Sequence, residues 1–275
     1  MTAPATALNW AAQFAELAAS ARDPRLQSFY QAGCVTADTP LEQVPLLALD
    51  VETTGLDANQ HAIVSLGLLP FTLQRIRCGA ARYWVVKPAS ELSGESVTFH
   101  HITHSDIRHA PRLGQILDEL LTAMAGKVMV VHYRNIERSF LDQALRQQVG
   151  EGLQFPVIDT MQLEARLYPK RQPGWLDRLL GRQPVSIRLA DSRLRYNLPM
   201  YQAHHALTDA LATAELLQAQ VATRYALEDD LLDRKRNAIQ QFVTQTGAVA
   251  GLECEPILPA AVLQRFERNY EVLIG

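Results

Sequence analysis

The sequence is poor in cysteine and contains no long hydrophobic run. Its three cysteines, Cys34, Cys78 and Cys254, are odd in number and too widely spaced for a zinc site or a disulfide framework, which favours a reducing compartment. No apolar stretch approaches the roughly 18 residues of a membrane span, and the N-terminus lacks the basic and then apolar order of a secretion signal. We therefore expect a cytoplasmic protein with no membrane partner.

Positive charge is also in short supply, because 26 Lys and Arg are outnumbered by 29 Asp and Glu. A net charge of −3 argues against a general affinity for phosphates. However, residues 166–195 hold eight Lys and Arg against two Asp, while the rest of the chain is acidic. In the basic, aromatic-bearing stretch from Tyr168 to Tyr201, Trp175, Tyr196 or Tyr201 could stack on bases while the cations follow a single strand. The alternative is a solvated, charged loop.

The order of the apolar segments predicts an α/β fold. Strands are expected at 45–51, 62–72, 76–87, 127–132 and 157–158, and helices at 112–125, 135–148, from 159 through Leu167, and 205–225. Pro and Gly make residues 168–200 loop-rich. Three consecutive strands followed by alternating helices and strands indicate a mixed five-stranded sheet flanked by helices.

Both ends of the chain extend beyond this region. Trp10 and Phe14 recur at helical spacing, which predicts an amphipathic helix over 7–22 that is closed by Pro24. Similar spacing near the C-terminus predicts further helices. The expected division is an N-terminal helical extension at 1–44, a central domain at 45–225 and a C-terminal helical extension at 226–275. The extensions either pack on the domain or offer a surface to a protein partner.

Two acids end the first apolar segment. Because residues i and i+2 of a strand share a face, Asp50 and Glu52 project together while Val51 packs behind them. Adjacent carboxylates repel, and their burial is costly unless a cation compensates. For an all-oxygen site that cation is a hard divalent ion such as Mg²⁺. The alternative is a solvated strand end followed by an ordinary turn.

The two acids belong to the first of three short motifs. The motifs are Asp50-Val51-Glu52-Thr53-Thr54-Gly55, His132-Tyr133-Arg134-Asn135-Ile136-Glu137-Arg138-Ser139-Phe140-Leu141 and His204-His205-Ala206-Leu207-Thr208-Asp209-Ala210. In order and separation they resemble the motifs of the DEDDh 3′→5′ exonucleases, the family of the DNA polymerase III epsilon subunit, of ribonuclease T and of oligoribonuclease. The resemblance covers about residues 45–225 and implies a ribonuclease H-like fold.

The resemblance also implies a site for two Mg²⁺ or Mn²⁺ ions. Asp50, Glu52 and Asp209 would bind one ion, and Asp50 with the acid of the second motif would bind the other. That acid is Glu137, where the family usually has Asp. Glutamate is one methylene longer but keeps the charge and donor type, so we expect a working but weaker second site. The alternative is a solvated Glu137, with Asp142 as a substitute ligand.

A histidine is expected as the general base, because imidazole has a pKa near 6.5 and accepts a water proton at neutral pH. The His-x-Ala-x-x-Asp spacing of the family selects His204, in register with Ala206 and Asp209. His205 is the alternative base, or else a structural residue at the start of the helix.

The loop after the first strand is the expected nucleotide-binding element. The backbone and hydroxyl groups of Thr53, Thr54 and Gly55 would grip the terminal nucleotide, and Leu56 would wedge beside the last base, as an apolar residue does in the family. Core packing is the alternative for Leu56. His132 of the second motif is a further candidate for substrate binding.

The expected function is a two-metal-ion 3′→5′ exonuclease that acts on the 3′ ends of single-stranded DNA or RNA, with DNA favoured, and releases nucleoside 5′-monophosphates. One alternative is an exoribonuclease or an enzyme for short oligonucleotides. The other is a catalytically weak nucleic-acid-binding or polymerase-associated scaffold.

Overall fold

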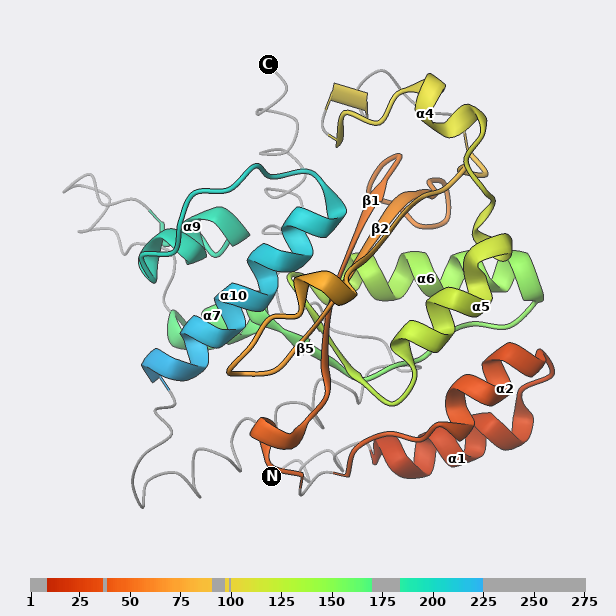
Figure 1. Ribbon diagram of the computed structural model, residues 1–275, viewed down its shortest axis with the longest axis horizontal. Coiled ribbons are helices and arrows are strands. Elements are labelled where there is room, and N and C mark those ends of the chain that lie inside the picture. The colour runs from red at the N-terminus through yellow and green to blue at the C-terminus, as the bar shows by residue number, and fades with distance from the viewer. Residues whose placement is uncertain (1–8, 37–38, 91–96, 99, 170–183, 225–275) are drawn as a thin grey trace.

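A mixed five-stranded sheet forms the centre of the computed structural model, which describes residues 9–36, 39–90, 97–98, 100–169 and 184–224 (Figure 1). The strands are β1 (Leu46–Thr53), β2 (Ile63–Phe71), β3 (Arg82–Val85), β4 (Val128–Val131) and β5 (Val157–Asp159), in the order β3-β2-β1-β4-β5. The pairs β1–β2 and β2–β3 are antiparallel, whereas β1–β4 and β4–β5 are parallel. The predicted mixed sheet is confirmed.

Helices cover both faces of the sheet. The helices are α1 (Trp10–Ser20), α2 (Pro24–Gln31), α4 (His104–Arg108), α5 (Leu113–Met124), α6 (Arg134–Val149), α7 (Thr160–Leu167), α9 (Leu189–Arg195) and α10 (Ala206–Arg224), with short 3-10 turns η1 (Leu41–Gln43) and η2 (Cys78–Ala80). In Figure 1 the helices α7, α9 and α10 lie on one side, and α5 and α6 lie on the other with α1 and α2 beyond them.

Strand β1 shows why the two acids face α10. Leu46 and Ala48 belong to the apolar cluster beneath α10, whereas Leu47 and Leu49 belong to the cluster beneath α5 and α6. The side chain of Asp50 is in phase with Leu46 and Ala48. A register slip of one residue would turn the acids into the apolar layer beneath α5 and α6, so the pairing of β1 is strongly specified.

The predicted N-terminal helix is present but ends differently from the prediction. Asn9 caps α1, since its side-chain oxygen accepts a hydrogen bond from Ala12 N at 3.2 Å. Pro24 was expected to close this helix, but it is instead the first residue of α2. Proline suits that position because its missing N–H has no intrahelical partner there. Asp23 caps α2.

The N-terminal helices pack on the domain through aromatic side chains. Trp10, Phe14, Phe29 and Tyr30 are all buried, with ring centroids 5.1–6.0 Å apart in the contacting pairs. They join the same apolar cluster as the residues of α5 and α6, and the Arg138 guanidinium of α6 lies 5.7 Å from the Trp10 ring. The apolar face of this extension is therefore covered by the domain itself.

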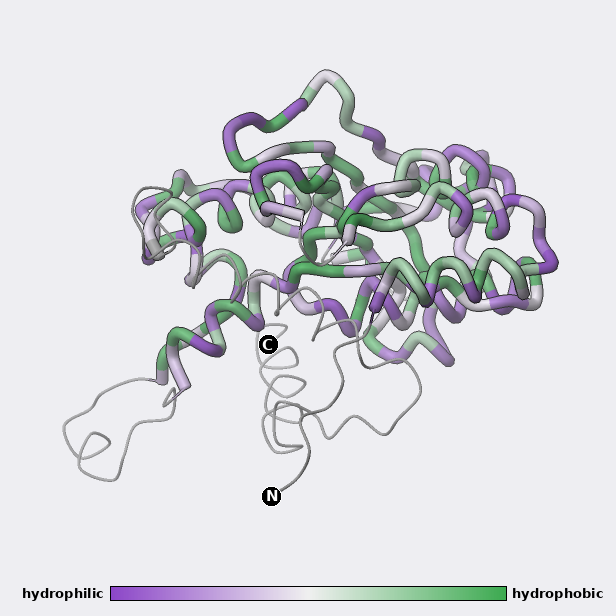
Figure 2. Tube along the Cα trace, turned by 90° about the horizontal axis from the view of Figure 1, so that it is seen from below, coloured by the Kyte–Doolittle hydropathy of each residue, from purple (hydrophilic) through white to green (hydrophobic). Residues whose placement is uncertain are grey.

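Other boundaries differ from the sequence predictions. The strand expected at 76–87 is reduced to β3, because the hairpin after β2 first forms η2. The short helices α4 and α9 were not predicted, and the predicted C-terminal helices lie outside the described residues. Figure 2 shows hydrophobic segments through the middle of the molecule and hydrophilic turns at its edge. Among the residues that the structure describes, none of the helices has the length and apolar character needed to cross a membrane.

Candidate active site

Three carboxylates meet where the C-terminal end of β1 passes the first turn of α10. Asp50 and Glu52 come from β1, and Asp209 comes from α10, about 160 residues away in the sequence. One carboxylate oxygen from each side chain lies within 4.8 Å of the other two, a spacing that suits the ligands of a metal ion. The structure thus brings the acids of the first and third motifs together.

The protonation of these acids reflects their crowding. Burial, followed by the negative charges of Asp209, Glu52 and Glu137, raises the pKa of Asp50 well above its usual range. Burial and the charge of Asp209 raise the pKa of Glu52 to about 8. Burial also raises the pKa of Asp209. A bound cation would offset this repulsion and favour the ionised form of all three acids, so the donor set fits a divalent metal.

Glu137 of α6 lies close enough to the cluster for its negative charge to raise the pKa of Asp50. Its side chain is 2% exposed, and its Oε2 atom has no hydrogen-bond partner within the described part of the chain. Burial raises the pKa of this carboxyl group. Asp142, the alternative ligand, instead pairs with Arg146 at 2.8 Å near the surface. Glu137 is therefore not a solvated helix residue, and its unpartnered oxygen is suited to a cation.

Asp159 fixes the start of α6. Its Oδ1 and Oδ2 atoms accept hydrogen bonds from the backbone N–H groups of Tyr133 and Arg134, each at 3.1 Å. Oδ1 also accepts a hydrogen bond from Met161 N at 3.0 Å, which caps α7. Tyr133 has a left-handed φ of 87°. One buried carboxylate thus joins two helix N-termini and holds the turn that directs Glu137 inward.

The two adjacent histidines are placed differently. Both are exposed, but the ring of His205 stacks on Tyr83 at 4.5 Å, and its backbone N–H donates to Oδ2 of Asp209 at 3.0 Å. His204 precedes α10 with a left-handed φ of 67°, and its charge opposes the rise in the pKa of Asp209 that burial causes. His204 therefore lies beside the cluster, whereas the ring of His205 is held against Tyr83.

Comparison with known proteins identifies the family. Residues 47–217 match the family model RNase_T, described as Exonuclease. The chain belongs to this exonuclease family. Over 182 residues it is 28% identical to DNA polymerase III subunit epsilon of Treponema pallidum, covering 66% of this chain and 78% of that protein. It is 27% identical to an epsilon-like protein of Rhodobacter capsulatus, of which it covers 24%.

Solved structures share the fold of the exonuclease. Exonuclease X in complex with 5′-overhanging duplex DNA superposes with a TM-score of 0.50 at 20% identity, over 69% of this chain and 99% of that one. The nuclease domain of 3′hExo, a DEDDh family member bound to rAMP, gives 0.54 at 14% identity, over 67% and 94%. The ribonuclease H-like fold and nuclease chemistry expected from the motifs are confirmed.

In the loop after β1 of the exonuclease, the threonine hydroxyl groups form hydrogen bonds with other parts of the protein. The Thr53 hydroxyl donates to Gly55 O at 2.6 Å. The Thr54 hydroxyl accepts a hydrogen bond from Ala62 N at 3.0 Å and lies 2.9 Å from the Ser90 hydroxyl. These two threonines therefore shape the loop. Leu56 is 41% exposed, which rules out full core packing and leaves its side chain accessible.

His132 is also committed to internal contacts. Its Nδ1 lies 2.8 Å from the Thr160 hydroxyl and its Nε2 lies 3.0 Å from Ile187 O. Burial lowers its pKa to about 4, so the ring is neutral at physiological pH. Because both ring nitrogens have protein partners, His132 fastens the second motif to neighbouring elements, and neither nitrogen is left for a nucleotide in this arrangement.

Two arginines of the basic stretch, Arg193 and Arg195, turn inward, contrary to both sequence interpretations, whereas Arg166 is exposed. Arg193 is 2% exposed and pairs with Glu215 at 2.7 Å, and Arg195 pairs with the buried Glu164 at 2.5 Å. The Tyr196 hydroxyl donates to Glu164 at 2.9 Å. These contacts dock α9 onto α7 and α10. Trp175, Lys170, Arg171, Arg178 and Arg182 lie outside the described residues.

The roles that three residues play around the site were not predicted. Tyr201 was expected to stack on bases, but its hydroxyl group hydrogen-bonds Asp209, and the Arg193 guanidinium lies 4.9 Å from its ring. Asp159 and Tyr83 support Glu137 and His205 as described above. The only sequence signal was a tyrosine or an acid near a motif or at a strand end. Many surface residues fit that description, so it does not show that the side chain contacts a residue of the site.

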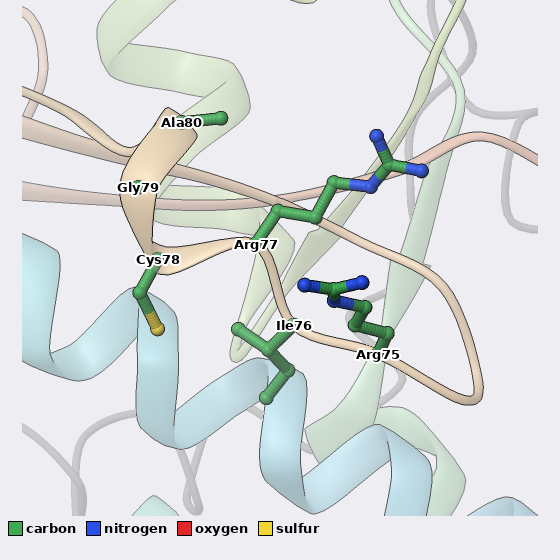
Figure 3. A pocket seen from close by; sticks show the side chains of 6 residues that line it. All are labelled: Arg75, Ile76, Arg77, Cys78, Gly79 and Ala80. Carbon is green, nitrogen blue, oxygen red and sulfur yellow. The ribbon is translucent and has the colours of Figure 1, made fainter.

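A separate hollow of about 380 Å³ lies on the hairpin between β2 and β3 (Figure 3). It is lined by Arg75, Ile76, Arg77, Cys78, Gly79 and Ala80. In Figure 3 the side chains of Ile76 and Cys78 point toward α10, whereas Arg77 points away. This hairpin follows the end of β2 that pairs with Leu46, so it lies at the opposite end of β1 from Glu52. None of the clustered acids lines it.

Proposed function

We propose that the protein is a metal-dependent 3′→5′ exonuclease that acts on single-stranded nucleic acid. The observation that carries the proposal is the convergence of Asp50, Glu52, Asp209 and Glu137. Three of these acids have carboxylate oxygens within 4.8 Å of one another, and the fourth has a buried oxygen without a hydrogen-bond partner among the described residues. A solely structural role would not account for four carboxyl groups with raised pKa values in one place.

The four acids divide between two ion positions. Asp50, Glu52 and Asp209 would hold one Mg²⁺ or Mn²⁺ ion, and Asp50 with Glu137 would hold the other. When bound, two such ions lower the pKa of an attacking water and stabilise the charge on the leaving oxygen. The acids of the first position have oxygens within 4.8 Å of one another, and the charge of Glu137 acts on Asp50, the acid common to both positions.

His204 is the proposed general base. It is exposed at the edge of the cluster, where its imidazole can accept the proton of the attacking water. The backbone of Gly55 and the exposed Leu56 side chain lie in the loop directly after the β1 acids, so they are placed to hold the terminal nucleotide and its base. The inward-turned Thr53 and Thr54 keep that loop in shape.

DNA is the favoured substrate, because the chain is similar to a DNA polymerase III subunit and to a nuclease solved with DNA. The neighbour bound to rAMP supports an exoribonuclease as the second candidate. The two differ in how the pocket treats the 2′-OH of the terminal nucleotide.

The deciding experiment incubates the protein with 5′-labelled DNA and RNA oligonucleotides of several lengths, with Mg²⁺, Mn²⁺ or chelator. We expect a ladder of progressively shorter labelled products and release of nucleoside 5′-monophosphates, dependent on metal. Immediate release of the labelled mononucleotide would indicate the opposite polarity. Binding without shortening, with wild-type protein indistinguishable from Asp50→Asn, would favour the scaffold alternative.

A further inference from the structure

We propose that Tyr83 is a positioning residue, whose ring stacks on His205 and thereby leaves His204 as the histidine that faces the metal ligands. The inference rests on the proposed function and deepens it, because it explains how the structure chooses between two adjacent histidines of equal chemistry.

The placement of Tyr83 follows from the sheet. Tyr83 pairs with Gly67 of β2, and Gly67 pairs with Asp50 of β1, so the three residues form one row across three strands. Gly67 occupies the middle of that row without a side chain, beneath the start of α10. Tyr83 therefore reaches His205 from the edge strand, beside the metal ligands. The charge of Glu52 contributes, after burial, to a raised pKa of Tyr83, which agrees with this proximity.

The contact itself is a parallel ring stack. The centroids of the Tyr83 and His205 rings are 4.5 Å apart, with an angle of 20° between the planes. Stacked aromatic pairs stabilise each other beyond the burial of their surfaces. His205 makes a second anchoring contact through its backbone N–H, which donates to Asp209 at 3.0 Å. Ring and backbone together hold His205 in one orientation.

His204 needs this anchor because of its backbone. Its φ of 67° is a left-handed conformation, which is unfavourable for a residue with a Cβ. Such a conformation persists only when contacts with the surrounding structure hold it in place. Directly after this left-handed turn, the ring of His205 lies on Tyr83. If the ring stack is lost, the turn has one anchor fewer, and either imidazole can sample the space beside the cluster. The stack therefore raises the fraction of molecules with His204 in place.

The first test measures kcat and KM for a single-stranded oligonucleotide. Tyr83→Ala and His205→Ala should each lower kcat by about 3- to 10-fold, as expected for the loss of one aromatic pair, with little change in KM. The double variant should be no worse than either single variant, because both remove the same contact. Tyr83→Phe keeps the ring and should restore most of the activity.

Trp84 provides a matched control. It is the next aromatic residue of β3, but its Nε1 donates to Glu119 of α5 on the opposite face of the sheet. Trp84→Ala should leave kcat at the wild-type value if the protein is folded. The proposal is overturned if Tyr83→Ala retains wild-type kcat, if Tyr83→Phe is as impaired as Tyr83→Ala, or if the effects of Tyr83→Ala and His205→Ala multiply in the double variant.

A second readout does not depend on activity. In proton NMR spectra, substoichiometric Mn²⁺ should broaden the imidazole resonances of His204 more than those of His205, and Tyr83→Ala should reduce that difference. His204→Gln and His205→Gln assign the resonances. Equal broadening in the wild-type protein would overturn the inference. If the wild-type protein shows the broadening pattern but degrades no oligonucleotide, the proposed function fails while the positioning role stands.

Discussion

Gly67 of β2 lies directly beneath the backbone of Ala206 at the start of α10. A Cβ atom built on Gly67 would stand 2.4 Å from the carbonyl carbon and oxygen of Ala206, far inside van der Waals contact. Gly67 also pairs with Asp50 in the sheet. The missing side chain thus lets α10 approach β1 closely enough for Asp209 to join the carboxylate cluster.

Gly67→Ala should therefore displace the start of α10 and lower activity by about 10²-fold, because a shift of about 1 Å in a catalytic group has an effect of this order. The neighbouring atoms are backbone, which cannot move aside as a flexible side chain would. The matched control is Gly79→Ala, where a Cβ meets no atom within 4 Å. Comparable kcat/KM values for the two variants would contradict this account.

Asp50→Asn should abolish turnover, because Asp50 is the acid proposed to contact both ions. The change keeps the shape of the side chain but removes the charge that attracts the metal. Excess chelator should have the same effect on the wild-type protein, reversed by added Mg²⁺. Asp118→Asn, an exposed acid of α5, serves as the control for a lost charge. Full activity of Asp50→Asn would refute the metal assignment.

Exchange of the histidines should separate their roles. His204→Ala should lower kcat by about 10²- to 10⁴-fold, the usual loss of a general base. His205→Ala should be much less impaired, because it loses the ring stack on Tyr83 and a 3.4 Å contact with the Thr208 hydroxyl but keeps the backbone hydrogen bond to Asp209. Single-turnover rates at saturating Mg²⁺ provide the comparison. If His205→Ala were the less active variant, the assignment would have to be reversed.

Substitutions of Glu137 test the second ion position. Glu137→Asp should keep substantial activity, since it restores the residue usual in the family, whereas Glu137→Gln should weaken metal binding and rate together. Asp142→Asn is the matched control on the same helix and should behave like the wild type. A Mg²⁺ titration of each variant measures both quantities. Wild-type behaviour of Glu137→Gln would mean that another group holds the second ion.

The pH dependence of stability should reveal the crowded acids. In the folded, metal-free protein Glu52 has a pKa of about 8, against an ordinary value of 4.5. The folded state therefore binds the proton more tightly, so the free energy of unfolding should fall as pH rises from about 4.5 to 8. Urea unfolding in chelator between pH 5 and 8 measures this slope. Glu52→Gln should make the slope shallower, and a slope unchanged by that substitution would count against the raised pKa.

The motifs were sufficient to predict the family and the identity of the clustered acids, and the order of the apolar segments predicted the mixed sheet. The acids could be identified from local chemistry. An apolar strand that ends in Asp50 and Glu52 requires a compensating cation if both acids are buried, whichever distant element supplies the remaining ligands. The alternation of β1 likewise assigns both acids to one face before any neighbour is known.

Tertiary structure decided what the polar groups around the motifs do. Arg193 and Arg195 could be assigned to phosphates from charge alone, yet they meet Glu215 and Glu164 when α9 docks. Asp159 holds the turn before Glu137, and the ring of His205 lies on Tyr83 of β3. These partners are far apart in the sequence. A side chain has the same hydrogen-bond donors and acceptors whether it binds a ligand or pairs with another residue of the protein. Only the packing of helices on the sheet determines which of them meet.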